Sequence, residues 1–452
     1  MISGLIKKAK SLVSKKTADM ALSPQSEPRT ILRKDHSISR KDISENTLKV
    51  LYRLKKHGFQ AHLVGGGVRD LLLKKHPKDF DVATDASPEE VKQIFSNCRL
   101  IGKRFRLAHV HFGRDIIEVA TFRGQVKTTH VDAKHSKEGM ILRDNVYGTI
   151  NEDAWRRDFT INALYYNIAD FSVLDFTGGM KDLNDRRIRM IGDAATRFTE
   201  DPVRMLRAIR FASKLDFHLS KELIKPIQKL NGLINHVPPA RLFEEMIKMF
   251  HCGAADKAFE SLLQYELFEP LFPQTYHCIQ DSKYPTKSLL KEVFQSTDTR
   301  IKQGKTITPV FIVAALLWHP ILKRAEIDIK NGTKLYPARL KAVESCLSEQ
   351  LKKISMPKRI SFGAREVWLL QLRMFNRHGK RPERLMQEPR FKAAYDFLLL
   401  RAKAGEPVKE LADWWEAYFE GNEDERRRLI RQVSSGGPKK RHHKRKTAED
   451  AG

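Results

Sequence analysis

Cysteine is scarce in this sequence and is not clustered. Four cysteines, Cys98, Cys252, Cys278 and Cys346, are spread over 452 residues, and none belongs to a Cys-x-x-Cys pair. This distribution excludes a disulfide-rich scaffold and the common cysteine-based zinc sites. It is typical of proteins that work in a reducing compartment, so we expect a cytoplasmic protein.

Long apolar segments are missing as well. The longest uninterrupted run, residues 310–318, has nine residues, whereas a membrane-spanning helix needs about 20. Glycine and proline, at 24 and 19 residues, are too few for a low-complexity chain. A chain of this length is expected to fold into about three domains, with disorder confined to short segments.

Positive charge is what the sequence has in excess. The formal net charge is +28. The first 20 and the last 19 residues each carry a net charge of +4, so a net charge of +20 remains on the chain between them. A folded body this basic indicates a polyanionic partner, and nucleic acid is the commonest one.

The two ends of the chain carry basic segments of different kinds. Residues 1–17 place apolar residues at helical spacing with lysines on the other face, and residues 18–40 have the composition of a linker. Such an arm can lie on an anionic membrane surface, or stay in solvent or against RNA. Residues 433–452 are expected to be a disordered basic tail. Its phosphate-binding side chains would be Lys439, Lys440, Arg441, Lys444, Arg445 and Lys446.

The clearest local pattern lies within residues 63–86. A short apolar strand ends at Val64 and runs into Gly65-Gly66-Gly67, and a helix follows. Glycines at such a turn let a phosphate approach backbone N–H groups at the start of a helix. The dinucleotide-binding fingerprint does not fit, because Asp70 occupies the position of its third glycine, and no P-loop lysine follows.

Two aspartates follow this turn. In a strand, Asp79 and Asp81 would point to one side while Phe80 points into the core. Adjacent carboxylates suit Mg²⁺, and two such ions can hold the attacking and leaving oxygens of a phosphoryl displacement. A third acid is expected nearby. Glu118, inside an apolar run, and Asp158 are both candidates, and the sequence does not choose between them.

Several motifs then occur in a fixed order. They are Gly65-Gly66, Arg69-Asp70, Asp79-x-Asp81, the segment RRDFTINA at 156–163, Asp175-x-x-Gly178-Gly179-x-x-Asp182-Leu183, and Glu200-Asp201-Pro202-x-Arg204. This set resembles the class II nucleotidyltransferases, the family of bacterial poly(A) polymerases and CCA-adding enzymes. The resemblance covers about residues 40–270 by motif and the later helical region more loosely.

The resemblance implies an α+β protein with a small mixed-sheet nucleotidyltransferase head, followed by a helical neck, body and tail. The segments would be an arm and linker at 1–40, the catalytic head at 41–190, a neck that recognises the base at 191–270, an RNA-binding body at 271–432 and the tail at 433–452. From about Glu200 onward the chain is indeed periodic at helical spacing, with short polar breaks.

The resemblance also implies roles for single residues. Asp79 and Asp81 would bind two Mg²⁺ ions as the catalytic pair, and Asp158 would be counted with the active site. Arg157 would lie near the triphosphate of the nucleotide substrate. The residues that contact its phosphates or order the turn would be Gly65, Gly66, Arg69 and Asp70.

The segment from residue 199 to 215 would read the base, and Asp201, Arg204 and Arg207 would contact the nucleotide. It predicts a helix with Asp201 as N-cap and Pro202 as first residue, and with Arg204, Arg207 and Arg210 on one face. The resemblance implies that Asp201 and Arg204 imitate a base-pairing partner. An acid beside an arginine matches the donor–acceptor edge of adenine or cytosine and leaves buried groups unpaired against guanine or uracil. The pair does not choose between ATP and CTP.

Residues 100–112 bear on that choice. Their sequence, LIGKRFRLAHVHF, resembles the stretch that separates poly(A) polymerases from CCA-adding enzymes, and Lys103 and Arg104 would bind triphosphate or primer RNA. The resemblance therefore implies template-independent polyadenylation of RNA 3′ ends from ATP, in RNA processing and decay and in contact with RNA-decay machinery. CCA addition to tRNA is the alternative, and a non-enzymatic RNA-binding protein is a third possibility.

Overall fold

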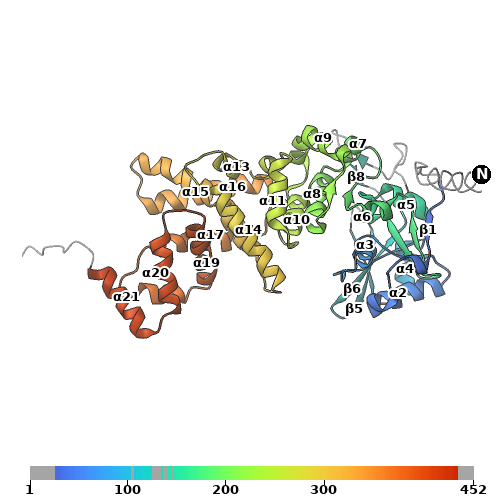
Figure 1. Ribbon diagram of the computed structural model, residues 1–452, viewed down its shortest axis with the longest axis horizontal. Helices are drawn as coiled ribbons and strands as arrows, with labels where there is room; N and C mark the ends of the chain where they lie inside the picture. The colour runs from blue at the N-terminus through green and yellow to red at the C-terminus, as the bar shows by residue number, and fades with distance from the viewer. Residues whose placement is uncertain (1–25, 103–105, 125–133, 136–140, 144–145, 436–452) are drawn as a thin grey trace, which may run out of the picture. The chain divides into compact units, whose positions relative to one another are not determined.

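The computed structural model describes residues 26–102, 106–124, 134–135, 141–143 and 146–435 (Figure 1). The chain divides into two compact units. The first comprises the residues up to Val237 together with 264–267, and the second comprises 238–263 and the residues from 268 onward. The mixed sheet of the first unit and the many helices confirm the α+β prediction.

The first unit is built on an eight-stranded sheet in the order β1-β10-β9-β2-β3-β6-β5-β4. Strands β3 and β6 run parallel, and the other neighbouring pairs run antiparallel. In sheet order the strands are β1 (Arg29–Ile31), β10 (Val173–Asp175), β9 (Leu164–Asn167), β2 (Ala61–Val64), β3 (Asp81–Thr84), β6 (Asp115–Thr121), β5 (Leu107–Phe112) and β4 (Cys98–Ile101). Two-residue strands β11 (Arg187–Ile188) and β12 (His218–Leu219) pair separately, as do β7 (Lys134–His135) and β8 (Ile141–Arg143).

Helices pack around this sheet wherever the sequence supplies an apolar stripe. In α2 (Glu45–Lys56) Ser44 accepts a hydrogen bond from Thr47 N, and Val50, Leu51 and Leu54 are fully buried. The other helices of the unit are η1 (Arg33–Asp35), η2 (Arg40–Asp42), α3 (Gly66–Leu72), α4 (Pro88–Ile94), α5 (Ile150–Arg156), η3 (Thr160–Asn162), α6 (Gly179–Asn184), α7 (Ala194–Glu200), α8 (Val203–Leu215), α9 (Lys221–Leu230) and η4 (Asn231–His236).

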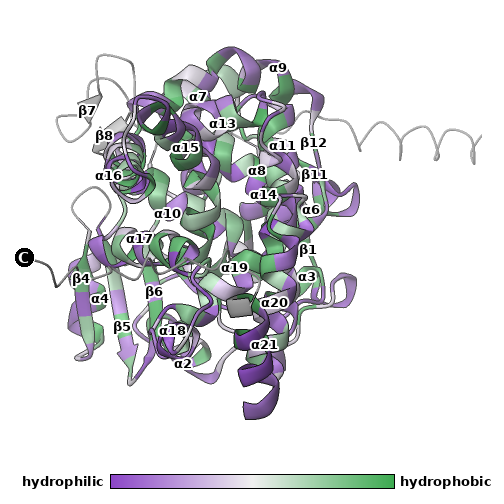
Figure 2. Cartoon of the chain, turned by 90° about the vertical axis from the view of Figure 1, so that its left-hand side faces the viewer, coloured by the Kyte–Doolittle hydropathy of each residue, from purple (hydrophilic) through white to green (hydrophobic). Residues whose placement is uncertain are grey.

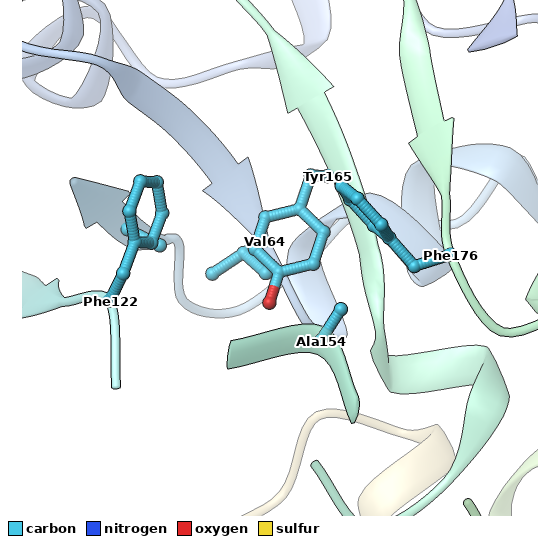
Figure 3. Close-up of a cluster of buried hydrophobic side chains, with 6 residues drawn as sticks. Val64, Phe122, Ala154, Tyr165 and Phe176 are labelled. Atoms are coloured by element: carbon cyan, nitrogen blue, oxygen red, sulfur yellow. The ribbon is translucent and has the colours of Figure 1, made fainter. Parts of the chain in front are cut away.

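The core of the first unit gathers where the central strands meet α5. Val64, Phe122, Ala154, Tyr165 and Phe176 are buried together (Figure 3). The Tyr165 ring meets the Phe176 ring edge-on at 5.8 Å between centroids. Figure 3 shows the Tyr165 hydroxyl directed toward the helix that carries Ala154, so this core side chain presents one polar atom to α5.

The neck helix α8 begins at Val203, one residue later than predicted. Asp201 is the C-cap of α7 with φ −149°, and Pro202 is the N-cap of α8, whose own side chain makes no capping hydrogen bond. Arg204 N instead donates to the Asp201 carbonyl at 3.0 Å. A short turn between two helices therefore replaces the expected cap.

The second unit is helical throughout its described residues. The apolar run at 310–318 lies in α15, where it is buried rather than exposed to lipid, and no helix in the part of the chain with described structure is long and apolar enough to cross a membrane. Helix α21 is hydrophilic along its length (Figure 2). The helices are α10 (Pro239–Phe250), α11 (Ala255–Gln264), α12 (Phe268–Leu271), α13 (Pro273–Ile279), α14 (Thr286–Lys302), α15 (Pro309–Lys330), α16 (Leu335–Lys353), α17 (Lys358–Arg373), α18 (Arg381–Met386), α19 (Phe391–Lys403), α20 (Lys409–Glu420) and α21 (Glu423–Ser435).

A buried carboxylate shapes the turn after β10. Asp175 is 1% exposed, and its two oxygens accept hydrogen bonds from four successive backbone N–H groups, those of residues 177–180, at 2.8–3.1 Å. Gly179 follows at the start of α6. A Cβ atom there would lie 2.3 Å from the Thr160 carbonyl oxygen, so glycine is required by close packing of two backbone segments.

We expect Gly179→Ala to lower the free energy of unfolding by about 1–3 kcal/mol, because backbone atoms cannot move aside cheaply. Gly232→Ala is the matched control, since its Cβ atom would meet nothing within 4 Å. Urea unfolding of the full chain, followed by circular dichroism, measures both. Equal effects of the two substitutions would contradict close packing at Gly179.

Candidate active site

Two carboxylates face one another across the parallel strand pair. Asp81 begins β3, and its register partner on β6 is Glu118. Residues in register on parallel neighbours project to the same face of a sheet, so both acids lie on one side of it. Both are exposed to solvent.

The prediction that Asp79 and Asp81 share one strand is wrong in detail. β3 begins only at Asp81, so Asp79 and Phe80 lie in the preceding loop. Phe80 is half-buried and closes over Gly67, whose Cβ atom would lie 3.3 Å from the Phe80 ring. Asp79 is nevertheless near enough for its charge to act on Asp81. The loop brings the acids together without strand alternation.

The pKa of the Asp81 carboxyl is raised above its ordinary value. The protein packed around its oxygens, followed by the negative charges of Glu118 and Asp79, raises its pKa to about 6, and the positive charge of Arg157 acts in the opposite direction. Asp81 is exposed as a residue, but its carboxyl group is surrounded by protein atoms and like charges, and we refer to the place where Asp79, Asp81 and Glu118 meet the Gly65 turn as the recess. A cation between these oxygens would relieve that repulsion.

Gly65 separates Asp81 from Arg157. Its φ of +72° lies in the region that favours glycine, and its Cβ atom would stand 3.5 Å from Arg157 Nη1 and 3.8 Å from Asp81 Oδ2. The glycine turn is thus the floor of the recess, with a carboxylate on one side and a guanidinium on the other. The structure brings Gly65, Asp81 and Arg157 together as the sequence predicts.

Arg157 is fixed from behind. Its Nε and Nη2 donate to Asp153 Oδ2 at 3.1 and 2.9 Å, and Nε also donates to the Tyr165 hydroxyl at 2.9 Å. That hydroxyl donates to Asp153 Oδ2 at 2.6 Å. Burial opposes ionisation of Asp153, but Arg157 and the Tyr165 hydroxyl hold its pKa below the usual range. Asp153 and Tyr165 were not predicted from the sequence, because no short motif connects them.

Arg69 and Asp70 have a structural role in the turn. Arg69 is 3% exposed and donates to Asp70 Oδ1 at 2.8 Å and to Asn162 Oδ1 at 2.8 Å. Its guanidinium also lies 5.2 Å from the centre of the Phe211 ring on α8. Of the two alternatives, ordering the turn accounts for these contacts better than phosphate contact does. Gly66 belongs to the same arrangement, because its Cβ atom would lie 3.6 Å from Arg69 Nη2.

Asp158 faces the neck rather than the recess. Arg207 of α8 donates to Asp158 Oδ2 through Nε at 2.7 Å, and Asn162 Nδ2 donates to Oδ1 at 3.2 Å. Burial alone would raise the pKa of Asp158, but Arg207 and these donors lower it to about 2. Arg207, predicted to contact the nucleotide, is therefore engaged with Asp158.

Arg204 is held by a neighbour to which the sequence motifs assign no role. Glu200 Oε2 accepts from Arg204 Nη1 at 2.8 Å and from Arg197 Nη1 at 2.7 Å. Arg197 Nη2 in turn donates to the carbonyl oxygen of Arg157 at 2.7 Å and to that of Arg156. These bonds link the Asp201–Arg204 turn to the segment that carries Arg157.

His109 is a further residue that was not predicted from the sequence. It is the cross-strand partner of Glu118 on β5, and its Nε2 lies 3.3 Å from Glu118 Oε1. The alternation His109-x-His111 on a strand next to the predicted acid was the available signal. Lys103 and Arg104, and the six basic residues from Lys439 to Lys446, lie outside the described residues.

The acids at the recess fit Mg²⁺ as partial ligands. Among the residues that the structure describes, no group of three or more His, Cys, Asp or Glu side chains could hold a metal by itself. Asp81 and Glu118, with Asp79 nearby, offer hard oxygen ligands. Mg²⁺ is commonly held by one or two carboxylates together with the phosphates of a substrate. The donor set therefore suits an ion that arrives with a nucleotide.

Comparison with protein families finds three matching models. One describes a poly A polymerase head domain and matches residues 61–189. Another describes a probable RNA and SrmB-binding site of polymerase A and matches 216–278. The third describes a polymerase A arginine-rich C-terminus and matches 331–448. Together they cover more than half of the chain, including both sides of the recess.

Individual relatives point the same way. Poly(A) polymerase I of Salmonella typhimurium is 50% identical over 392 residues, which are 85% of this chain and 84% of that protein. The CCA-adding enzyme of Bacillus subtilis is 36% identical over 62% of this chain and 69% of its own. The solved structure of the Bacillus stearothermophilus CCA-adding enzyme in complex with CTP has a TM-score of 0.53 at 24% identity, over 88% of this chain and 83% of that chain, which shows the fold.

Asp81→Asn should stabilise the metal-free protein at pH 8. The folded pKa of about 6 exceeds the ordinary value of 3.8, so folding favours the protonated carboxyl. Stability is lost as pH rises through this range, and an asparagine avoids that loss. In EDTA we expect a melting temperature about 1–3 °C above wild type at pH 8, with a smaller difference at pH 5.

Asp42→Asn, at an exposed aspartate of the same unit, is the control and should not change the melting temperature. Added Mg²⁺ should raise the melting temperature of the wild type more than that of Asp81→Asn. A variant less stable than wild type at pH 8 would show that Asp81 does not bear the repulsion inferred here.

Proposed function

Because this chain belongs to the poly(A) polymerase I family of class II nucleotidyltransferases, we propose that it extends RNA 3′ ends with adenosine nucleotides from ATP, without a template. The observation that carries the proposal is the 50% identity to poly(A) polymerase I along most of both chains, which exceeds the 33–37% identity to the CCA-adding enzymes. The family predicted from the ordered motifs is confirmed.

The proposed reaction forms one bond and breaks another at phosphorus. The primer 3′-hydroxyl oxygen attacks the α-phosphorus of ATP, and the bond to the pyrophosphate oxygen breaks. When bound by Asp79, Asp81 and Glu118, two Mg²⁺ ions would supply acidification of the hydroxyl and stabilisation of the leaving charge. The register of β3 and β6 sets the spacing of Asp81 and Glu118 before any substrate arrives.

Arg157 would contribute a fixed positive charge beside the triphosphate. Its guanidinium reaches the recess across Gly65, while Asp153 and Tyr165 hold it from the core side. A charge that is already oriented needs no reorganisation as negative charge develops on the leaving group. The buried contacts of Asp153 and Tyr165 would therefore support the reaction by keeping Arg157 oriented.

Base selection would depend on the Asp201–Arg204 turn. Glu200 and the Arg197 carbonyl oxygen both accept from Arg204 Nη1, which restricts the orientation of that guanidinium. A held guanidinium and an acid match the edge of adenine, and a mismatched base would leave a buried donor or acceptor unpaired. Glu200 is therefore a positioning residue for the base-reading arginine.

The remaining parts of the proposal concern binding outside the recess. Lys103, Arg104 and the basic residues of the tail would bind RNA phosphates, since lysine and arginine clusters bind the backbone without reading sequence. The arm at 1–40 would place a cytoplasmic enzyme against an anionic inner-membrane surface. Its products would enter RNA processing and decay, together with the machinery that degrades RNA. We also propose that the chain is divided into the arm, head, neck, body and tail at the boundaries predicted from the sequence.

Glu118→Gln and Asp158→Asn test which acid belongs to the site. Loss of a ligand charge at Glu118 should lower kcat at least about 100-fold without loss of stability. Asp158→Asn should instead lower the free energy of unfolding by about 2–3 kcal/mol, because it removes the charge partner of Arg207. Primer-extension kinetics and urea unfolding measure the two effects. A stable but inactive Asp158→Asn would assign the third acid to Asp158.

Extension of an unstructured RNA with single nucleotides tests the activity itself. We expect long products with ATP and none with CTP, GTP or UTP, and no extension by Asp81→Ala, which should bind RNA as the wild type does. A tRNA that lacks its 3′ end is the second substrate. Addition that stops after C-C-A on that tRNA would favour the CCA-adding alternative, and absence of pyrophosphate release would refute both.

A further inference from the structure

A cavity of about 470 Å³ lies within the second unit, apart from the residues of the candidate active site. Its walls come from α14, α15 and α19 and from the segments that precede α15 and α19. The volume falls in the range of about 300–1,000 Å³ found for pockets that enclose small molecules. All of its lining residues belong to one unit, so the cavity does not depend on how the two units are placed.

The walls of this cavity combine three kinds of surface. Phe311, Ile312 and Leu400 supply aromatic and aliphatic area, and Ser296, Thr306 and Thr308 supply hydroxyl groups. A flat apolar surface bordered by hydroxyls suits a nucleobase and its ribose. Phe311 is half-buried, and its ring meets Phe397 edge-on at 6.0 Å, which fixes its orientation.

Positive charge predominates among the charged residues that line the cavity. Arg300, Arg390 and Lys392 are the cations of the lining, and Asp396 is its acid, which leaves a local net charge of +2. Asp396 lies 2.9 Å from Lys392 Nζ and 3.9 Å from Arg300 Nη1, so it chiefly neutralises Lys392. The sign of this charge suits a phosphate.

Arg390 is placed to bind that phosphate. Its Nε lies 3.4 Å from Glu366 Oε2, a long contact on a half-exposed pair. A guanidinium has five N–H donors, so this contact leaves donors on the terminal nitrogens. Arg390 also lines a second, smaller cavity of about 120 Å³. Arg390 therefore lies between the two cavities, where it could bind a phosphate that links two nucleosides.

We propose that the larger cavity binds one nucleotide of single-stranded RNA, with the base against Phe311 and the phosphate at Arg390 and Arg300. The inference rests on the proposed RNA substrate and adds a site for that RNA in the second unit. RNA is favoured over an acidic peptide because a peptide carboxylate would use the cations but not the aromatic and hydroxyl-lined interior. It is favoured over a free nucleoside triphosphate because the charge of that ligand would exceed the positive charge of the lining.

Two variants of the full-length protein separate the charge from the interior. Arg390→Gln removes the phosphate contact, and Ala393→Phe fills the cavity. Arg365→Gln is the matched control, because Arg365 is also a half-exposed arginine paired with one glutamate, Glu344, in the same unit. The probe is a fluorescent oligoadenylate of about 15 nucleotides, whose anisotropy is followed without ATP over a range of salt concentrations.

We expect Arg390→Gln to raise the Kd for this RNA about three- to tenfold and to reduce the slope of log Kd against log salt by about 0.7, the value for one phosphate on a single strand. Ala393→Phe should raise the Kd about threefold or more with the slope unchanged. Arg365→Gln should match the wild type. Circular dichroism melting curves confirm that each variant is folded.

Three results would overturn the proposal. Equal Kd values for Arg390→Gln and Arg365→Gln would show that Arg390 does not contact an RNA phosphate. Competition by free AMP as effective as that by the RNA would make the cavity a free-nucleotide site. Binding of a polyglutamate peptide that is lost in Ala393→Phe would make it an acidic-peptide site. Because no ATP is present, failure of the cavity and failure of the extension activity are observed separately.

Discussion

Two like charges in register on parallel strands are the constraint on which the first unit depends. Asp81 and Glu118 are adjacent because β3 and β6 pair in parallel, and burial of the Asp81 carboxyl followed by the repulsion from Glu118 raises the pKa of Asp81. A folded chain tolerates such a pair only if something compensates it. Arg157 does so in part, and it can act across the turn because Gly65 has no side chain to intervene.

That compensation extends into the hydrophobic core. Arg157 is oriented by Asp153 and Tyr165, and the Tyr165 ring is packed among Val64 and Phe176 (Figure 3). Buried charges are costly unless they are paired and hydrogen-bonded. The packing of the core therefore fixes a hydroxyl, the hydroxyl and Asp153 fix a guanidinium, and the guanidinium faces the recess. A loss of packing at Tyr165 would therefore alter the orientation of Arg157 at the candidate active site.

The family motifs are informative for two different reasons. Asp81 and Gly65 belong to the recess, whereas Asp175 and Arg69 organise backbone and connect helices. Sequence patterns predicted the strand ending at Val64 and the proximity of the aspartates to the glycine turn, because both follow from local spacing. They did not predict that β3 begins after Phe80 or that Tyr165 supports Arg157. Those features depend on contacts between distant segments, which local spacing does not encode.

The choice between Glu118 and Asp158 shows where electrostatics adds to sequence. Asp158 belongs to the RRDFTINA motif and Glu118 to an apolar run, and of the two only Asp158 has an arginine that balances its charge. Asp158 has an arginine and an amide donor that keep it ionised, so its charge is already satisfied. Glu118 stands beside another carboxylate and contributes to the raised pKa of Asp81. An acid that still repels its neighbour is the one that a metal ion would stabilise most.

The turn between α7 and α8 also holds two like charges close together, here the positive charges of Arg197 and Arg204. Arg197 and Arg204 both donate to Glu200, so one carboxylate serves two guanidiniums. Burial, together with the nearby charge of Arg204, lowers the pKa of Arg197 to about 10. Like charges therefore lie close together both at β3 and β6 and at this turn, and the bonds of Arg197 to the Arg156 and Arg157 carbonyl oxygens connect the two places. A ligand that carries both a cation and phosphates would relieve the repulsion within each of these two groups of like charges.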